Sequence, residues 1–105
     1  EISNIQLIYQ FFKQGMEICI YDAQNKLYLL DSGKVFRRSE LYGKYISFMP
    51  LTEVVLGLTL KGFKYPLNRR RIELGSCLCI SNELNGEEGI MEVESGVLIC
   101  VEAHD

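Results

Sequence analysis

Histidine is nearly absent from this chain of 105 residues, which has a single one at position 104. A Ser-His or Cys-His catalytic pair needs a histidine held firmly by the fold, and one next to the end of the chain is poorly placed for that role. The cysteines do not form the C-x-x-C pairs of a zinc site. Neither a Walker-type phosphate loop nor a glycine-rich dinucleotide fingerprint occurs. An independent small enzyme is therefore the least favoured class of function.

Long apolar runs are also missing, and none approaches the roughly 20 residues that a membrane-spanning helix needs. No secretory signal pattern is found either. The net charge of −3 provides no general attraction to nucleic acid or to anionic lipid. Together with the 48% hydrophobic content, these features predict one cytoplasmic, globular domain without a nucleic-acid or membrane partner.

The four cysteines, Cys19, Cys77, Cys79 and Cys100, lie in apolar, β-branched surroundings. Cys77 and Cys79 are two residues apart, so in a strand they share a face, and a disulfide between them would be badly strained. We expect four reduced thiols in the core, because free cysteine is among the most buried residue types. A redox role is the alternative.

One helix is predicted, over Ser3–Gln14, with Ser3 or Asn4 as its cap and Gly15 as its end. An apolar stripe at helical spacing runs through Ile5, Ile8, Tyr9 and Phe12. Leu7 and Phe11 widen this stripe beyond one face, and such a helix normally packs on more than one side. We expect that it packed against a part of the protein that is not in this chain; packing on the β domain alone, or dimerisation, is the alternative.

After residue 17 the apolar pattern changes to the period of β-strands. Turn-forming residues separate short candidate strands. The expected strands are Ile18–Tyr21, Lys26–Leu30, Lys34–Arg38, Tyr45–Met49, Val54–Lys61, Phe63–Leu67, Arg71–Leu74, Cys77–Ser81, Gly89–Glu94 and Val97–Glu102. The predicted fold class is mainly β, an antiparallel sandwich or barrel-like domain preceded by one α-helix.

Two charged clusters are candidate binding or catalytic sites. Alternation places Glu92 and Glu94 on one face of a strand, which is typical of a solvated face and only rarely of a metal or acid-base site. The run Arg69-Arg70-Arg71 is able to hold a phosphate. A charged turn between strands is the favoured interpretation of this run.

A polar pair, Ser81 and Asn82, ends an otherwise apolar segment. Such groups at strand ends are able to meet a ligand, although a turn cap is the commoner role. Alternation places Phe63 and Tyr65 on one face, where they would form an aromatic wall. Glu83 adds a carboxylate that would favour a cationic ligand.

Three blocks of the sequence resemble the C-terminal, thiamine-binding domain of bacterial thiamine pyrophosphokinases. They are Gly-Leu-Thr-Leu-Lys-Gly-Phe-Lys-Tyr-Pro-Leu at 57–67, Leu-Gly-Ser at 74–76 and Ile-Ser-Asn-Glu at 80–83. The fragment Ser-Asn-Ile-Gln-Leu at 3–7 is similar to the end of the family's catalytic-domain motif, whose Asp-His pair would precede Glu1. Cys79 departs from the family, whose members often have glycine or serine there.

The resemblance implies a function and a site. The family transfers a pyrophosphoryl group from ATP to thiamine and releases AMP, with ATP and Mg²⁺ bound in an N-terminal α/β domain. It implies that Ser81 and Asn82 contact or frame the thiamine pyrimidine and that Tyr65 lines the same site. Glu83 is the weaker fourth member. No residue of this chain is expected to be catalytic or to bind metal.

The resemblance also divides the chain, with 1–17 as a remnant helix of the catalytic domain and 18–105 as the thiamine-binding domain. A longer, homodimeric parent protein is expected, because the chain begins with Glu1 and the family is dimeric. The chain alone is expected to be inactive and to bind neither ATP nor Mg²⁺. A β-sandwich module for self-association or interaction is the alternative function.

Overall fold

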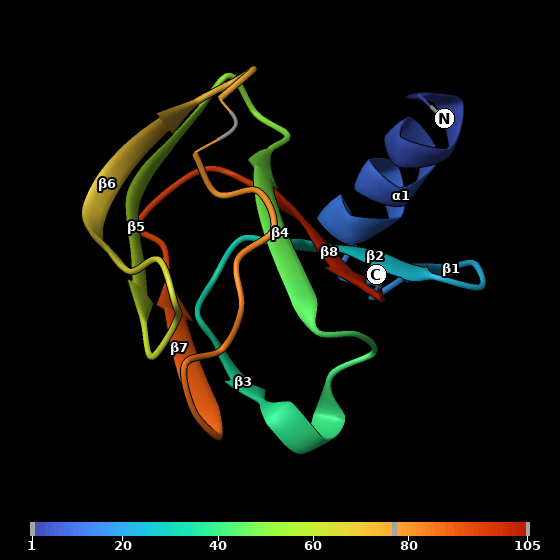
Figure 1. Cartoon of the computed structure of the whole chain (residues 1–105). Coiled ribbons are helices and arrows are strands. Elements are labelled where there is room, and N and C mark those ends of the chain that lie inside the picture. The colour runs from blue at the N-terminus through green and yellow to red at the C-terminus, as the bar shows by residue number, and fades with distance from the viewer. Residues whose placement is uncertain (1, 77, 105) are drawn as a thin grey trace.

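The computed structural model describes the backbone of residues 2–76 and 78–104, and the side chains of these ranges from residue 5 on. Within these residues, one α-helix is followed by eight strands (Figure 1). The elements are α1 (Ile2–Lys13), β1 (Ile20–Tyr21), β2 (Asn25–Leu30), β3 (Lys34–Arg37), a 3₁₀ turn (Arg38–Glu40), β4 (Tyr45–Pro50), β5 (Val54–Lys61), β6 (Leu67–Glu73), β7 (Glu88–Glu92) and β8 (Leu98–Ala103).

The strands form two four-stranded sheets. Sheet A has the order β1-β2-β8-β4, and sheet B has the order β3-β7-β5-β6. Every pairing within the two sheets is antiparallel. The predicted fold class, mainly β with one helix in front, is confirmed.

The core lies between the sheets because apolar side chains alternate along the strands. In β4 the inward positions include Ile46 and Phe48, and in β8 they include Leu98 and Cys100; all four are at most 1% exposed. Phe48 also meets Phe36 of β3 edge-to-face, with ring centroids 5.7 Å apart. This contact joins sheet A to sheet B, so the two sheets share one core.

Helix α1 lies beside sheet A and contacts β2 (Figure 1). Ile8 of the predicted stripe is buried, whereas Leu7 is 50% exposed. Gly15 ends the helix with a positive φ of 86°, as predicted. The helix already includes Ile2, so the prediction that Ser3 or Asn4 caps it is wrong.

The strand predictions differ in accuracy along the chain. Strand β5 has the predicted bounds, Val54–Lys61. The predicted strand Phe63–Leu67 is instead a turn that leads into β6. Arg69, Arg70 and Arg71 lie within β6, so the expected charged turn is wrong.

The segment 78–81 is not a strand, although Cys77–Ser81 was expected to be one. Its residues form turns beside β4 and are tied to it by an isolated bridge between Ile46 and Asn82. Leu78 and Ile80 are exposed. The prediction failed because it took the apolar residues of this segment as evidence of a buried strand.

The thiols differ in their surroundings. Cys79 and Cys100 are buried and free, as predicted. Burial raises the pKa of the Cys79 thiol to about 11 and that of Cys100 to about 12. Cys19 is exposed, so its predicted place in the core is wrong; it lies in the linker between α1 and β1, outside any inward-facing strand position. Cys77 lies outside the described residues.

Candidate functional site: the Tyr65 face

The predicted site residues lie on two segments that run next to one another, the turn 62–66 after β5 and the segment 78–84 along β4. The bridge between Phe63 and Leu84 joins them. Gly62 begins the turn with φ at 79°, and a Cβ atom there would lie 2.6 Å from the carbonyl oxygen of Glu88. Only glycine fits such a position without strain, so this residue fixes how the turn leaves β5. We call the surface around Tyr65 on these segments the Tyr65 face.

Phe63 and Tyr65 do not form a shared aromatic wall. Phe63 is 2% exposed and packs edge-to-face against Phe36 and Phe48 in the core. Tyr65 is 55% exposed. The expectation that both rings share one face is wrong, because the segment is a turn and its residues do not alternate as in a strand. Tyr65 remains as the one ring on this surface that was predicted to meet a ligand.

Asn82 holds the backbone of Tyr65 by both ends of its side-chain amide. Its Oδ1 accepts a hydrogen bond from the Tyr65 N–H at 3.0 Å, and its Nδ2 donates to the Tyr65 carbonyl at 2.9 Å. Oδ1 also accepts from the N–H of Glu83 at 2.9 Å. Asn82 is only 2% exposed. The hydrogen bonds that satisfy its buried amide also fix the backbone of Tyr65, whose ring is exposed.

Ser81 lies in an uncommon backbone conformation, with φ at 57°. A non-glycine residue in this region costs free energy unless its surroundings hold it there. The Ser81 N–H donates to Oγ of Ser47 on β4 at 2.8 Å, which supplies that restraint. Ser81 is exposed, so its side chain is presented to solvent on the same segment as Asn82.

Glu83 lies between two lysines. Its carboxylate is 3.8 Å from the ammonium of Lys44 and 3.8 Å from that of Lys64. The Lys64 ammonium also lies 5.5 Å from the centre of the Tyr65 ring. The negative charge expected to attract a cationic ligand is thus already balanced by two positive charges. Cys79 is buried and belongs to the core.

The sequence interpretation missed Glu102, a buried carboxylate with 3% exposure. The hydroxyl of Tyr28 donates to its Oε2, and the N–H of Tyr42 donates to its Oε1 at 2.8 Å. Burial, aided by this carboxylate, raises the pKa of Tyr28. The signal was present, because alternation along β8 places Glu102 on the buried face with Leu98 and Cys100.

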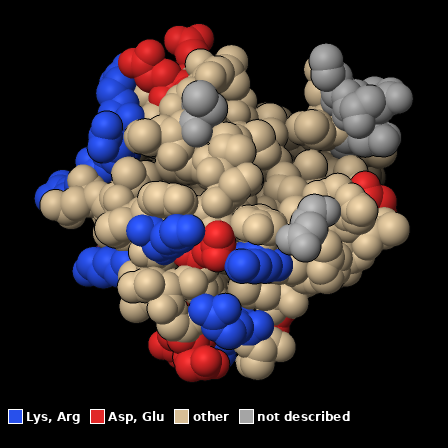
Figure 2. All heavy atoms as spheres, in the orientation of Figure 1, with Lys and Arg blue, Asp and Glu red and all other residues tan. Residues whose placement is uncertain are grey.

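The surface charge of the molecule is mixed. Figure 2 shows basic and acidic side chains next to one another on the viewed face, among larger uncharged areas. Glu92 and Glu94 are exposed, whereas Met91, which was predicted to lie on the opposite face, is buried. This agrees with the prediction that the two glutamates lie on a solvated face. Within residues 2–76 and 78–104, no helix is long and apolar enough to cross a membrane. The same part of the chain contains no cluster of three potential metal ligands.

A cavity of about 400 Å³ opens elsewhere, between the end of α1 and β2. None of Tyr65, Ser81, Asn82 and Glu83 lines it. The Tyr65 face lies beside β4, at the opposite edge of sheet A from β1 and β2. The cavity and the Tyr65 face are therefore separate features.

Comparison with known proteins identifies the domain. The family model described as "Thiamin pyrophosphokinase, vitamin B1 binding domain" matches residues 34–98. A curated thiamine pyrophosphokinase from Bacillus subtilis (strain 168) is 41% identical over 104 residues, which are 99% of this chain and 49% of that protein. The chain thus spans about half the length of the curated relative that it matches.

Solved structures of thiamine pyrophosphokinases also match this chain. The crystal structure of thiamine pyrophosphokinase from B. subtilis matches with a TM-score of 0.91 and 41% identity, over 99% of this chain and 49% of that one. The enzyme from Geobacillus thermodenitrificans matches with a TM-score of 0.86 and 34% identity, over 99% and 47%. With its two-sheet fold and the match over residues 34–98, this chain belongs to the thiamin pyrophosphokinase family, as a vitamin B1 binding domain.

Proposed function

We propose that this chain binds thiamine on the Tyr65 face and serves as the substrate-holding part of a thiamine pyrophosphokinase. The observation that carries the proposal is the pairing of the family match with an exposed ring whose backbone is held by a buried amide. An aromatic ring fixed before the ligand arrives loses little conformational freedom on binding. Its face also attracts a cation such as the thiazolium ring.

The four predicted residues take different parts in this proposal. Tyr65 stacks against thiamine, and the exposed hydroxyl of Ser81 is able to hydrogen-bond to the aminopyrimidine. Asn82 frames the site by positioning Tyr65, since its own amide groups are engaged within the chain. Glu83 is the weakest member, because Lys44 and Lys64 already balance its charge.

The reaction of the whole enzyme, transfer of a pyrophosphoryl group from ATP to thiamine, is proposed for a longer parent protein. Such transfer depends on metal ions and positioned phosphates. We assign ATP and Mg²⁺ to a catalytic part outside this chain, and we assign 1–17 to that part and 18–105 to the thiamine-binding part. The proposed parent is a cytoplasmic homodimer.

Self-association is supported by exposed apolar side chains in the stretch 74–80. Leu74, Leu78 and Ile80 are 63%, 47% and 43% exposed. Exposed apolar groups gathered in one stretch mark a candidate interaction surface. A non-catalytic module that only self-associates is the second candidate function, and it predicts a dimer that does not respond to thiamine.

Titration calorimetry with thiamine tests the main proposal. We expect saturable binding to the chain and a loss of affinity of about fivefold to thirtyfold in Tyr65→Ala, because stacking and cation–π contacts contribute about 1–2 kcal/mol. Ser81→Ala should weaken binding less. Tyr21→Ala is the matched control, since Tyr21 is 57% exposed and also has a lysine near its ring. Absence of binding, or an equal loss in Tyr21→Ala, would contradict the proposal.

A further inference from the structure

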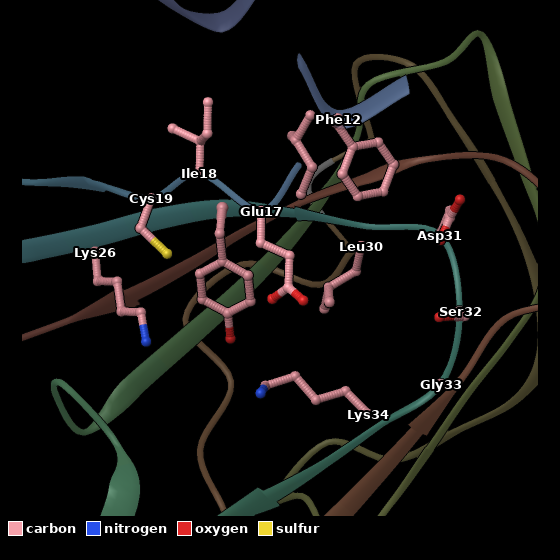
Figure 3. A pocket seen from close by; sticks show the side chains of 12 residues that line it. Phe12, Glu17, Ile18, Cys19, Lys26, Leu30, Asp31, Ser32, Gly33 and Lys34 are labelled. Carbon is pink, nitrogen blue, oxygen red and sulfur yellow. The ribbon is translucent and has the colours of Figure 1, made fainter. Parts of the chain in front are cut away.

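The cavity between α1 and sheet A has the size and lining of a small-molecule site. It is enclosed by the end of α1, the linker 17–19, strand β2 and the turn from β2 to β3 (Figure 3). Its volume of about 400 Å³ lies within the range of about 300–1,000 Å³ found for ligand pockets. Nothing in the proposed thiamine site accounts for it, because it lies at the other edge of sheet A.

Two lysines bring positive charge to this cavity. The ammonium nitrogens of Lys26 and Lys34 lie 5.1 and 5.7 Å from the centre of the same ring, that of Tyr28. Both side chains are half-buried. The ion pairs found among the described residues involve neither lysine. Partly desolvated cations of this kind are stabilised by an anion that enters between them.

Carboxylates that line the cavity offset part of this positive charge. Glu102 is buried and does not line the cavity; it accepts hydrogen bonds from the Tyr28 hydroxyl and from the backbone N–H of Tyr42. Glu17 and Asp31 also line the cavity, but both are exposed. In Figure 3 the Glu17 carboxylate points into the cavity from the linker. Glu17 would therefore compete with an anionic ligand for the lysines.

Part of the cavity wall is apolar. Phe12 of α1 and Leu29 and Leu30 of β2 contribute to it, and Figure 3 shows Phe12 and Leu30 on the same side of the cavity. A bare inorganic ion would leave this wall in contact with water. A ligand with an apolar body covers it and gains free energy from burial.

We propose that this cavity binds a small organic phosphate, whose dianionic head lies between Lys26 and Lys34 and whose apolar body lies against Phe12 and Leu30. Two ammonium groups match a phosphate monoester better than a monoanionic carboxylate, because the second ionisation occurs near pH 6. The net charge of −3 opposes general attraction of anions, so binding of this kind depends on the local pair of lysines.

Titration of the chain with phenyl phosphate at pH 7.5, followed by amide chemical shifts, tests the proposal. We expect saturable shifts around the cavity and about tenfold weaker binding in Lys26→Met/Lys34→Met, because the head group loses both charges. Glu17→Gln should bind about twofold more tightly, since a competing negative charge is removed. Lys61→Met is the control, because Lys61 is an exposed lysine outside the cavity, and its affinity should not change.

Several results would overturn the proposal. They are no saturable binding at millimolar phenyl phosphate, equal loss in the Lys61 variant, or weaker binding in Glu17→Gln. Equal affinity for inorganic phosphate would exclude a role for the apolar wall, and tighter binding of benzamidine would show that the cavity prefers cations. The Glu17 variant keeps the test decisive if the double lysine variant fails to fold, because it predicts a gain.

Discussion

At the scale of single residues, Asn82 connects the stability of the domain with the shape of its proposed site. The hydrogen bonds from its buried amide lock Tyr65 against the segment that carries Ser81 and Glu83. Sequence reasoning grouped Asn82 with Tyr65, and the structure brings the two residues together, with the Asn82 side chain bonded to the Tyr65 backbone. No local pattern distinguishes an asparagine that binds a ligand from one that holds a turn.

We predict that Asn82→Ala lowers both the free energy of unfolding and the affinity for thiamine. Losing the amide leaves partly buried backbone groups of Tyr65 without their partners, which costs about 1 kcal/mol. Urea unfolding measures the first effect and calorimetry the second. Ser81→Ala is the control for stability, because only its backbone N–H is bonded to Ser47. An unchanged unfolding free energy with lost affinity would show that Asn82 acts on the ligand directly.

At the scale of elements, the sequence predicted the strands that have one buried and one exposed face. Strand β4, predicted over Tyr45–Met49, extends one residue further to Pro50, because buried and partly buried positions alternate regularly along it. The turn 62–66 and the segment 78–84 were misassigned, since their apolar residues serve a turn and a surface. Phe63 points into the core while Leu78 and Ile80 face solvent. The structure of such segments is determined by packing against residues that are distant in the sequence.

The segment 78–84 is predicted to form part of the dimer contact. Leu78→Ser/Ile80→Ser should shift the protein from dimer to monomer in sedimentation velocity, because the exposed apolar surface that drives association is lost. Leu7→Ser on α1 is the matched control, since Leu7 is 50% exposed. A monomeric wild type, or dissociation caused by the α1 variant alone, would contradict this placement.

At the scale of the whole molecule, the two sheets depend on one core that buries several ionisable groups. Burial raises the pKa of Cys79 to about 11 and that of Cys100 to about 12, and it raises the pKa of Tyr28 as well. In the unfolded chain these thiols ionise near their ordinary pKa of 9.0. The stability that they contribute is therefore complete below pH 9 and is lost as the pH rises toward their folded pKa values.

We predict a fall in the free energy of unfolding between pH 9 and pH 11, measured by urea titration. Each pH unit above the unfolded pKa of Cys100 costs about 1.4 kcal/mol. Cys100→Ala should be less stable at pH 7.5 but should show a shallower fall. Cys19→Ala is the control, because Cys19 is exposed, and its pH dependence should match that of the wild type. Equal slopes in all three proteins would contradict the prediction.

The arginines of β6 have a consequence for solubility. Strand β6 ends the order of sheet B, and Arg69, Arg70 and Arg71 are all exposed along it. An edge strand has unpaired backbone groups that are able to pair with a strand of another chain. Positively charged side chains along the edge strand make this pairing unfavourable. We therefore expect this run to disfavour the addition of another chain at β6, mainly through Arg70, because Arg69 and Arg71 are paired with Glu94 and Glu73.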